Sequence, residues 1–364
     1  MKILCVIDSL GSGGAQRQLV NLALAFREKG HEVEFLVYHS DPFYDDILKE
    51  ANITIIEVIE KNYLKRIFKM RKVIREGNYD SVLSFLEAAS FICTIAGFPY
   101  RKWTLIVGER SANPNIFKSF KLKFYRWFHI FTSAVVANSY QNINMVKKIN
   151  PLISDKKLHV IYNLTDFEKW NFKSENYIYR NNGKFNLTVV ASHQYLKNLN
   201  GLVEAVNLLS HEQKKVLNIH WYGGERPDNS KIEAISKIKK YDLNEIFIFH
   251  EPTLDIASKV NQADAVGLFS FYEGLPNVVC EAMANQKPVI ASNISDMSLL
   301  IDKSFTFDPN KPKEISKNLQ HLLSLDESSL RRIGQRNKEV SLQLFNKEVI
   351  VKEYISIMSG GFVV

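Results

Sequence analysis

The chain has 364 residues, a length that allows two domains of ordinary size. Its 46% hydrophobic and 24% charged residues are typical of a soluble globular protein that buries a core. Three cysteines, an odd number without metal-ligand spacing, argue against a disulfide framework and indicate reduced thiols in the cytosol. The longest apolar stretch, near residues 88–98, is too short to span a bilayer, and residues 1–10 predict a core strand rather than a signal peptide.

The net charge of +8 is unevenly distributed along the chain. Residues 1–165 contain 23 Lys and Arg against 15 Asp and Glu, whereas the remainder contains 24 of each. Plain solubility is one interpretation, and an anionic partner of the first half, either a membrane surface or a phosphate-bearing molecule, is the other. Nucleic acid is not expected, because the basic residues form no recognised module and the second half is neutral.

The chain opens with the pattern of a Rossmann-like domain. A strand at residues 2–7 is followed by a glycine-rich turn that contains Gly13 and Gly14, and then by an amphipathic helix to about residue 29. The dinucleotide-binding fingerprint fits poorly, because Gln16 occupies its third small-residue position. Further strands of the first domain are predicted at residues 31–38, 53–59, 80–85, 104–107, 134–139 and 159–163. Glu109 and Arg110 follow the fourth of these, at the edge where a doubly wound sheet places ligand groups.

Two basic segments interrupt this series of strands. Residues 61–76 predict an amphipathic basic helix. In residues 117–131, aromatic side chains recur at helical spacing and alternate with lysines and an arginine. Such a helix can lie at a membrane interface, and the alternative is a core-packed helix with a solvated basic edge.

A second strand–loop–helix series follows a polar stretch. Residues 166–184 carry no strong period and are interpreted as the interdomain linker. Strands are then predicted at residues 187–191, 217–222 and 246–250, and the last helix at about residues 347–358. The predicted organisation is thus an α/β domain of residues 1–165, the linker 166–184, a second α/β domain of residues 185–345, and a C-terminal segment 346–364.

Residues 265–292 carry the most informative pattern. A buried strand leads into the loop Tyr-Glu-Gly-Leu-Pro-Asn, in which Pro276 suits the first position of a helix. Glu273 lies on the loop and Glu281 lies inside the helix, so two carboxylates flank a helix N-terminus. Free N–H groups at such a terminus bind anions or sugar oxygens. The stretch therefore suits a polyhydroxylated, negatively charged ligand.

Glu273 and Glu281, separated by seven residues with Gly-Leu-Pro after the first, resemble the Glu-x7-Glu signature of retaining glycosyltransferases of family 4. The resemblance implies the GT-B fold, with two Rossmann-like doubly wound domains facing across a cleft and a C-terminal helix that packs back on the first domain. It also implies a hexosyltransferase that needs no metal and no cofactor, since the nucleotide-sugar is a co-substrate. The chain shows neither a metal-ligand cluster nor an Asp-x-Asp pair.

The resemblance also assigns roles to individual residues. Lys197 and Glu273 are the expected catalytic groups, with Glu109 as a third candidate that orients or deprotonates an acceptor hydroxyl. A structural salt bridge is the alternative for Glu109 and Arg110. The donor-binding residues implied are Gly13, Gly14, Lys197, Glu251, Glu273, Gly274, Leu275, Pro276, Asn277, Val278 and Glu281. The acceptor-side candidates are Gln16, Glu109 and Arg110.

The chain departs from the family pattern at two positions. Ser192 stands where the family has an arginine five residues before Lys197, which leaves His193 or another residue to compensate for the lost charge. Glu109 and Arg110 stand in a loop where some members have a histidine.

The resemblance further predicts a nucleotide-sugar donor, with a UDP-sugar expected, and a saccharide acceptor. The basic, aromatic first domain suggests that this acceptor is lipid-linked, as in surface-polysaccharide, capsule or lipopolysaccharide synthesis. The expected location is the cytoplasm, with peripheral contact between the basic first domain and an anionic membrane. Two alternatives remain: a non-catalytic nucleotide-sugar-binding partner subunit, and a nucleotide-sugar epimerase of the same fold.

Overall fold

A computed structural model describes residues 1–170 and 177–360. The chain forms two compact units. The first unit joins Met1–Leu164 to the segment that begins at Lys347, and the second unit is Thr165–Asn346. The second unit begins at Thr165, whereas the second domain is predicted to begin at residue 185. Six residues of the predicted linker, 171–176, lie outside the described residues.

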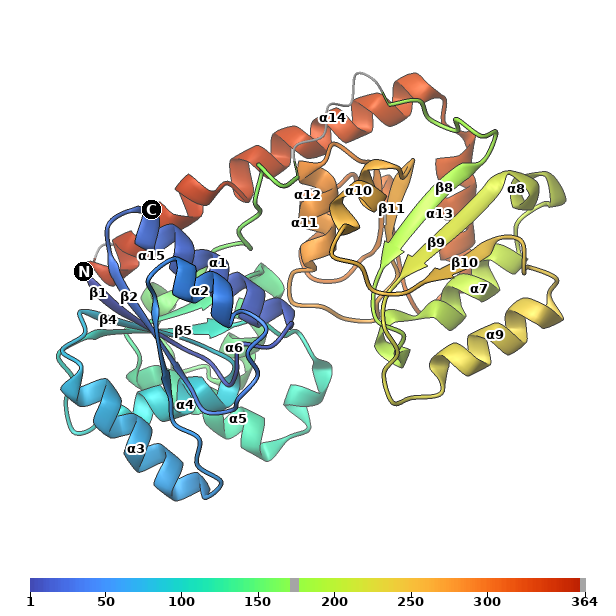
Figure 1. The fold of residues 1–364 in the computed structure, drawn as a ribbon. Coiled ribbons are helices and arrows are strands. Elements are labelled where there is room, and N and C mark those ends of the chain that lie inside the picture. The colour runs from blue at the N-terminus through green and yellow to red at the C-terminus, as the bar shows by residue number, and fades with distance from the viewer. Residues whose placement is uncertain (171–176, 361–364) are drawn as a thin grey trace. The chain divides into compact units, whose positions relative to one another are not determined.

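The first unit is built on a seven-stranded parallel sheet of order β3-β2-β1-β4-β5-β6-β7 (Figure 1). The order reverses direction between β1 and β4, as in a doubly wound Rossmann-like sheet, so the predicted fold class is confirmed. The strands are β1 (Lys2–Val6), β2 (Glu32–Val37), β3 (Thr54–Glu57), β4 (Ser81–Phe85), β5 (Thr104–Glu109), β6 (Ala134–Ala137) and β7 (Leu158–Val160).

Successive residues of each strand point to opposite faces of the sheet, and both sets are apolar. Helices therefore cover both faces. Ile3 and Cys5 of β1 belong to a core cluster with residues of the first and the last helix, among them Phe26 and Tyr354. Leu4 and Val6 belong to a second cluster on the other face, with Met70 among its helix residues. The helices and 3₁₀ turns of the unit are α1 (Gly14–Glu28), α2 (Asp45–Glu50), α3 (Tyr63–Glu76), α4 (Glu87–Ala96), η1 (Pro114–Phe117), α5 (Phe120–Trp127), η2 (Phe128–Phe131), α6 (Tyr140–Ile149), η3 (Asp155–Lys157) and α15 (Lys347–Met358).

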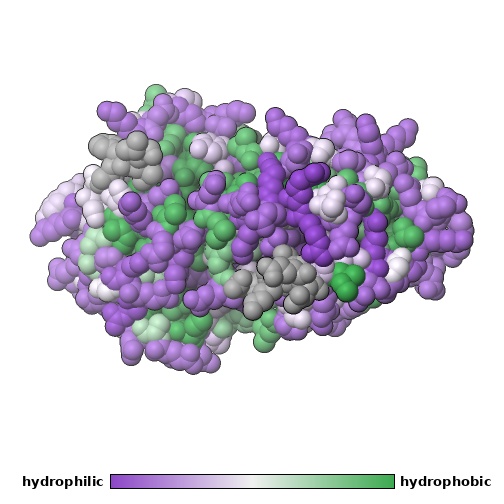
Figure 2. Space-filling view, turned by 90° about the horizontal axis from the view of Figure 1, so that it is seen from above, coloured by the Kyte–Doolittle hydropathy of each residue, from purple (hydrophilic) through white to green (hydrophobic). Residues whose placement is uncertain are grey.

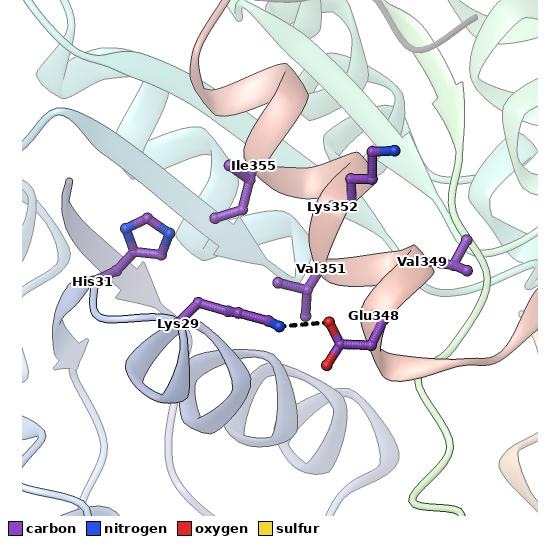
Figure 3. A pocket seen from close by; sticks show the side chains of 7 residues that line it. All are labelled: Lys29, His31, Glu348, Val349, Val351, Lys352 and Ile355. Atoms are coloured by element: carbon purple, nitrogen blue, oxygen red, sulfur yellow. Dashed lines mark hydrogen bonds and ion pairs between the residues drawn. The ribbon is translucent and has the colours of Figure 1, made fainter.

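The C-terminal helix α15 packs against α1 of the first unit. Its Tyr354 lies edge-on to Phe26, with ring centroids 6.2 Å apart. Lys29 pairs with Glu348 at 2.5 Å beside an open pocket of about 440 Å³, which is lined mainly by aliphatic atoms (Figure 3). Apolar packing therefore attaches the end of the chain, and exposed ion pairs flank the contact.

The second unit repeats the same topology with a six-stranded parallel sheet of order β10-β9-β8-β11-β12-β13. Its strands are β8 (Phe185–Val190), β9 (Leu217–Tyr222), β10 (Phe247–His250), β11 (Ala265–Leu268), β12 (Val289–Ser292) and β13 (Thr306–Phe307). Its helices and turns are η5 (Tyr195–Lys197), α7 (Leu199–Asn207), α8 (His211–Val216), α9 (Ser230–Lys240), α10 (Ile256–Asn261), α11 (Asn277–Ala284), α12 (Met297–Leu300), η6 (Lys303–Phe305), α13 (Pro312–Ser324) and α14 (Glu327–Leu344). The reversal falls between β8 and β11, so the loops after these two strands lie side by side.

Part of the predicted linker is not a free connection. The Tyr177 hydroxyl donates to Asp264, and the Arg180 guanidinium donates to the carbonyls of Leu323 and Leu325. Tyr177 and Arg180 therefore attach this part of the predicted linker to the rest of the second unit. Over the described residues, no helix combines the length and the apolarity needed to cross a membrane. The face seen in Figure 2 is mainly hydrophilic, with hydrophobic residues in small groups.

Candidate active site

The two acidic residues of the Glu-x7-Glu pattern lie at the β11–α11 connection of the second unit. Glu273 stands on the loop and Glu281 in the second turn of α11, and both are half-buried. The sequence predicts Pro276 at the first position of the helix, but in the structure Pro276 is the N-cap of α11. Its backbone, with φ −72° and ψ 117°, is extended and not helical. The helix therefore begins at Asn277, and its N-terminus faces the loop that carries Glu273.

Lys197 approaches Glu273 from the neighbouring β8–α7 connection. Its ammonium pairs with Oε1 of Glu273, which also accepts a hydrogen bond from Ser270 Oγ at 2.9 Å. The Lys197 and Glu273 side chains remain 19% and 18% exposed, so a ligand can reach both. Two residues predicted to bind the donor are thus brought together, with Ser270 as a further member that the sequence alone did not single out.

Asn198 fixes the backbone from which Lys197 projects. It has a left-handed conformation with φ 56° and caps α7 by accepting a hydrogen bond from Gly201 N at 3.1 Å. Its amide also donates to the carbonyl of Pro309 at 2.8 Å. The β8–α7 and β11–α11 loops are further joined by a hydrogen bond from Phe271 N to Leu196 O at 3.0 Å. The pair of Lys197 and Glu273 is therefore held by two connected loops.

His193 does not replace the charge that is missing at Ser192. The imidazole is 3% exposed, stacks on Trp221 and lies edge-on to Phe249. Burial, reinforced by the nearby Lys231 ammonium, lowers the pKa of His193 to about 4. The ring is therefore neutral at physiological pH in this structure and supplies no positive charge in place of the missing arginine. Lys197 is the cation that this loop presents.

The remaining donor-side residues lie in loops and at helix ends. Gly274 uses its carbonyl to accept a hydrogen bond from Ser295 Oγ. Glu251 is exposed immediately after β10. In the first unit, Gly13 is the exposed N-cap of α1, and Gln16 donates to Asp8 Oδ1 at 2.9 Å. The first turn of α1 contains no acidic residue, so the positive end of its dipole favours the binding of an anion.

Glu109 lies inside a buried ion-pair cluster of the first unit. Its carboxylate pairs with Arg126 at 2.7 Å and with His129 at 2.7 Å, and Arg126 also reaches Glu87 at 3.2 Å. Although burial raises the pKa of Glu109, the charges and hydrogen bonds of Arg126 and His129 outweigh it and lower the value to about 2. So acidic a group is a poor general base, and the geometry favours the salt-bridge alternative.

Arg110 is likewise engaged within its own unit. Its guanidinium donates to the Tyr354 hydroxyl and to Asn163 Oδ1, and lies 3.9 Å from the centre of the Phe85 ring. Arg110 therefore connects the end of β5 to α15, and phosphate binding by this side chain stays a prediction. The partners of Glu109 and Arg110 are distant in the sequence, so no local motif could have predicted them.

Two family models match successive parts of the chain. Residues 12–169 match the model described as Glycosyltransferase Family 4, and residues 172–340 match the model described as Glycosyl transferases group 1. The two matches follow the order of the two units and together cover most of the chain.

Individual relatives agree with these matches. An uncharacterized glycosyltransferase of Haemophilus influenzae is 23% identical over 381 aligned residues, which cover 97% of this chain and 95% of the relative. The GalNAc-α-(1→4)-GalNAc-α-(1→3)-diNAcBac-PP-undecaprenol α-1,4-N-acetyl-D-galactosaminyltransferase of Campylobacter jejuni is 34% identical over 119 residues. That match covers 30% of this chain and only 33% of the C. jejuni protein.

Solved structures share the whole fold. HepE from Anabaena, crystallised with UDP, has a TM-score of 0.86 at 19% identity and covers 99% of this chain and 100% of its own. The same protein in complex with UDP-glucose has a TM-score of 0.84.

Proposed function

The chain belongs to glycosyltransferase family 4 and has the GT-B fold, and we propose that it transfers a hexose from a UDP-sugar to a lipid-linked saccharide with retention of configuration. The UDP-sugar is supported by HepE, whose structures hold UDP and UDP-glucose. The lipid-linked acceptor is supported by the C. jejuni relative, whose acceptor is attached to undecaprenyl diphosphate. Synthesis of a surface polysaccharide at the cytoplasmic face of a membrane is the setting that we propose.

The observation that carries the donor assignment is the pairing of Lys197 with Glu273 beside the N-terminus of α11. A nucleoside diphosphate offers Lys197 an anionic partner in place of Glu273. The released carboxylate can then accept hydrogen bonds from hydroxyls of the donor sugar. Lys197 and the positive end of the α11 dipole would stabilise the charge that develops on the leaving diphosphate. We propose that Glu281 binds the ribose hydroxyls and that no metal is required.

The acceptor side is assigned to the first unit. Its candidate is Gln16, in the first turn of α1. The neighbouring Gly13 stays a donor-side residue, where the absence of a side chain lets a ligand approach the backbone. Arg110 and Glu109 are engaged by protein partners, so we propose that they position this region and that neither acts as the base. The departing phosphate is then the group that accepts the acceptor proton, as the resemblance implies.

The donor site is tested by titrating UDP, GDP and ADP against the wild type, Lys197→Ala and Glu281→Ala while the melting temperature is recorded. We expect stabilisation by UDP that both variants lose. Lys237→Ala is the matched control, because Lys237 also pairs with a glutamate of the second unit, at 3.0 Å from Glu204. Equal stabilisation of all four proteins by UDP, or none of the wild type, would refute the donor site.

Transfer itself is tested with UDP-hexoses and a lipid-linked saccharide, and the anomeric configuration of the product is read by NMR. A product of inverted configuration would contradict retention. Conversion of the UDP-hexose to its epimer without an acceptor would identify an epimerase. Binding of UDP without any turnover would favour the partner-subunit alternative. The observation behind that alternative is Ser192, which stands where the family has an arginine.

A further inference from the structure

The segment η1–α5–η2 exposes a row of aromatic side chains on one side. Phe117, Phe120, Phe124, Trp127 and Phe131 follow one another at steps of three and four residues, and they are 42%, 81%, 41%, 45% and 47% exposed. We call these five residues the aromatic row. Only two other Phe or Trp residues of the described chain, Phe43 and Phe68, are as exposed, and both also lie in the first unit. The core-packed alternative for this row is therefore wrong.

Three rings of the row, those of Phe120, Phe124 and Phe131, are linked by ring contacts. Phe120 and Phe124 stack with centroids 6.4 Å apart, and Phe124 contacts Phe128, whose ring in turn contacts Phe131. Contiguous exposed apolar surface of this kind marks an interaction site, whereas single exposed apolar residues are ordinary.

The opposite side of the segment fixes the row in its outward orientation. Arg126 and His129 are buried and bind Glu109 at the end of β5. Ser119 caps α5 by accepting a hydrogen bond from Leu122 N at 3.3 Å. Turning the aromatic row inward would pull Arg126 and His129 away from Glu109 and expose this ion-pair cluster. The cluster around Glu109 thus positions the row.

The surroundings of the aromatic row are basic. Residues 117–131 contain no acidic side chain, and Lys118 and Lys121 are exposed within the row. The nearby carboxylates of Glu87 and Glu109 both pair with Arg126, which offsets part of their charge. The neighbouring helix α3 adds exposed Lys65 and Lys72.

Helix α3 also extends the apolar surface. Leu64 and Phe68 are 65% and 70% exposed, and the Tyr63 hydroxyl lies 3.3 Å from that of Tyr125 in α5. Both helices belong to the first unit (Figure 1), and both carry exposed apolar side chains and exposed lysines.

We propose that the aromatic row, with Leu64 and Phe68 of α3, docks onto a lipid bilayer that carries anionic headgroups. The rings would enter the interface, and Lys118 and Lys121 would bind the headgroups. A second copy of the chain is disfavoured as the occupant, because two such basic surfaces repel each other. This inference deepens the proposed function, since a membrane-bound surface would meet a lipid-linked acceptor, but its test requires no sugar transfer.

The test is sedimentation with phosphatidylcholine vesicles, with and without phosphatidylglycerol. We expect the wild type to bind only the anionic vesicles, and to bind less as salt rises. The double variant Phe120→Ser/Trp127→Ser and the double variant Lys118→Glu/Lys121→Glu should each lose at least about tenfold in affinity. An unchanged melting temperature and unchanged UDP binding would show that both variants are folded.

Matched controls come from the second unit. Leu254→Ser/Leu299→Ser removes two side chains that are 88% and 62% exposed, and Lys313→Glu/Lys317→Glu reverses two exposed charges. Both controls should bind vesicles as the wild type does. Failure of the wild type to bind anionic vesicles, or equal losses in variants and controls, overturns the proposal. Dimerisation that Phe120→Ser/Trp127→Ser abolishes, with vesicle binding unchanged, also overturns it. Vesicle binding by a protein that transfers sugar to no acceptor would support the membrane-docking proposal and contradict only the proposed function.

Discussion

Lys197 and Glu273, 76 positions apart in the sequence, form an ion pair at the loops that follow two neighbouring strands of the second unit. The cation that is assigned to the donor diphosphate is therefore already neutralised by a carboxylate of the protein. Donor binding exchanges one anionic partner of Lys197 for another. The cost of opening this pair reduces the net gain from binding the diphosphate.

Glu273→Gln should consequently bind free UDP more tightly than the wild type. Removing the competing charge of a partly exposed pair corresponds to at most about 1 kcal/mol, or roughly a fivefold gain in affinity. Turnover should nevertheless fall by about a hundredfold or more, because the carboxylate that binds the donor sugar is lost. Calorimetric titration with UDP and initial rates with a UDP-hexose measure the two effects separately.

Glu225→Gln provides the control for this exchange, because Glu225 pairs with Lys231 at 2.7 Å in the same unit. It should leave both the UDP affinity and the rate unchanged. A weaker affinity of Glu273→Gln for UDP would show that Glu273 supports nucleotide binding and does not compete with it.

Glu109→Gln should destabilise the first unit and not abolish the chemical step. The change leaves Arg126, which is 1% exposed, without its closest carboxylate, and such a loss costs about 3–5 kcal/mol. The folded-state pKa of Glu109, about 2, lies below its ordinary value of 4.5. The stabilisation is therefore complete above pH 4.5 and disappears as the pH falls towards 2.

Denaturant unfolding of the wild type and Glu109→Gln at neutral pH and near pH 3 measures this difference. The gap in the free energy of unfolding should shrink at the lower pH. Exposed Glu50 offers the comparison, since Glu50→Gln should change little at either pH. A Glu109→Gln protein of normal stability whose kcat has collapsed would instead establish Glu109 as the general base.

Features that depend on residues close together in the sequence could be predicted, and features that depend on residues far apart could not. The strand–loop–helix repeats and the β11–α11 loop are local patterns, so both sheets and the loop that carries Glu273 could be predicted. The environment of Glu109 could not, because Arg126 and His129 lie 17 and 20 positions away and only the tertiary fold brings them to the end of β5. The neutral state of His193 follows in the same way from burial against Trp221.

Continuous periodicity also concealed a break in structure. The aromatic spacing of residues 117–131 predicted one helix, whereas the structure has η1, α5 and η2 in succession. Ser119 starts α5 by capping it, which interrupts the helix without disturbing the spacing of the exposed rings. The periodicity identified which aromatic side chains lie on the same side of the segment. Only the structure showed that this side is exposed.

Asn198→Ala should weaken both the second unit and its donor site. Alanine cannot cap α7 and is strained at the φ of 56°, so a loss of about 2 kcal/mol in the free energy of unfolding is expected. Asn198→Gly tolerates the left-handed backbone and should lose less. UDP affinity should fall in the same order, because the backbone at residue 198 directs Lys197. Equal losses in the two variants would mean that the side-chain hydrogen bonds of Asn198, and not its backbone conformation, hold the loop.

Lys287 should make the stability of the second unit depend on pH in the alkaline range. The ammonium is buried, donates to Asn261 O at 2.7 Å and lies 3.5 Å from the centre of the Tyr177 ring. Burial lowers the pKa of Lys287 from 10.5 to about 7, although the carboxylate of Asp264 opposes the shift. Between these two values the unfolded chain binds a proton that the folded protein lacks. The contribution of Lys287 to stability is therefore largest above pH 10.5 and decreases until the pH reaches about 7.

Lys287→Met keeps the volume of the side chain and removes the titration. The difference in unfolding free energy between the wild type and Lys287→Met should shift in favour of the wild type by a few kcal/mol between pH 7 and pH 10. Lys239→Met, at an exposed position of α9, should show no such shift, and tyrosines that titrate in this range are common to all three proteins. A constant difference across the range would mean that Lys287 stays protonated in the folded protein, held by the Tyr177 ring and the charge of Asp264.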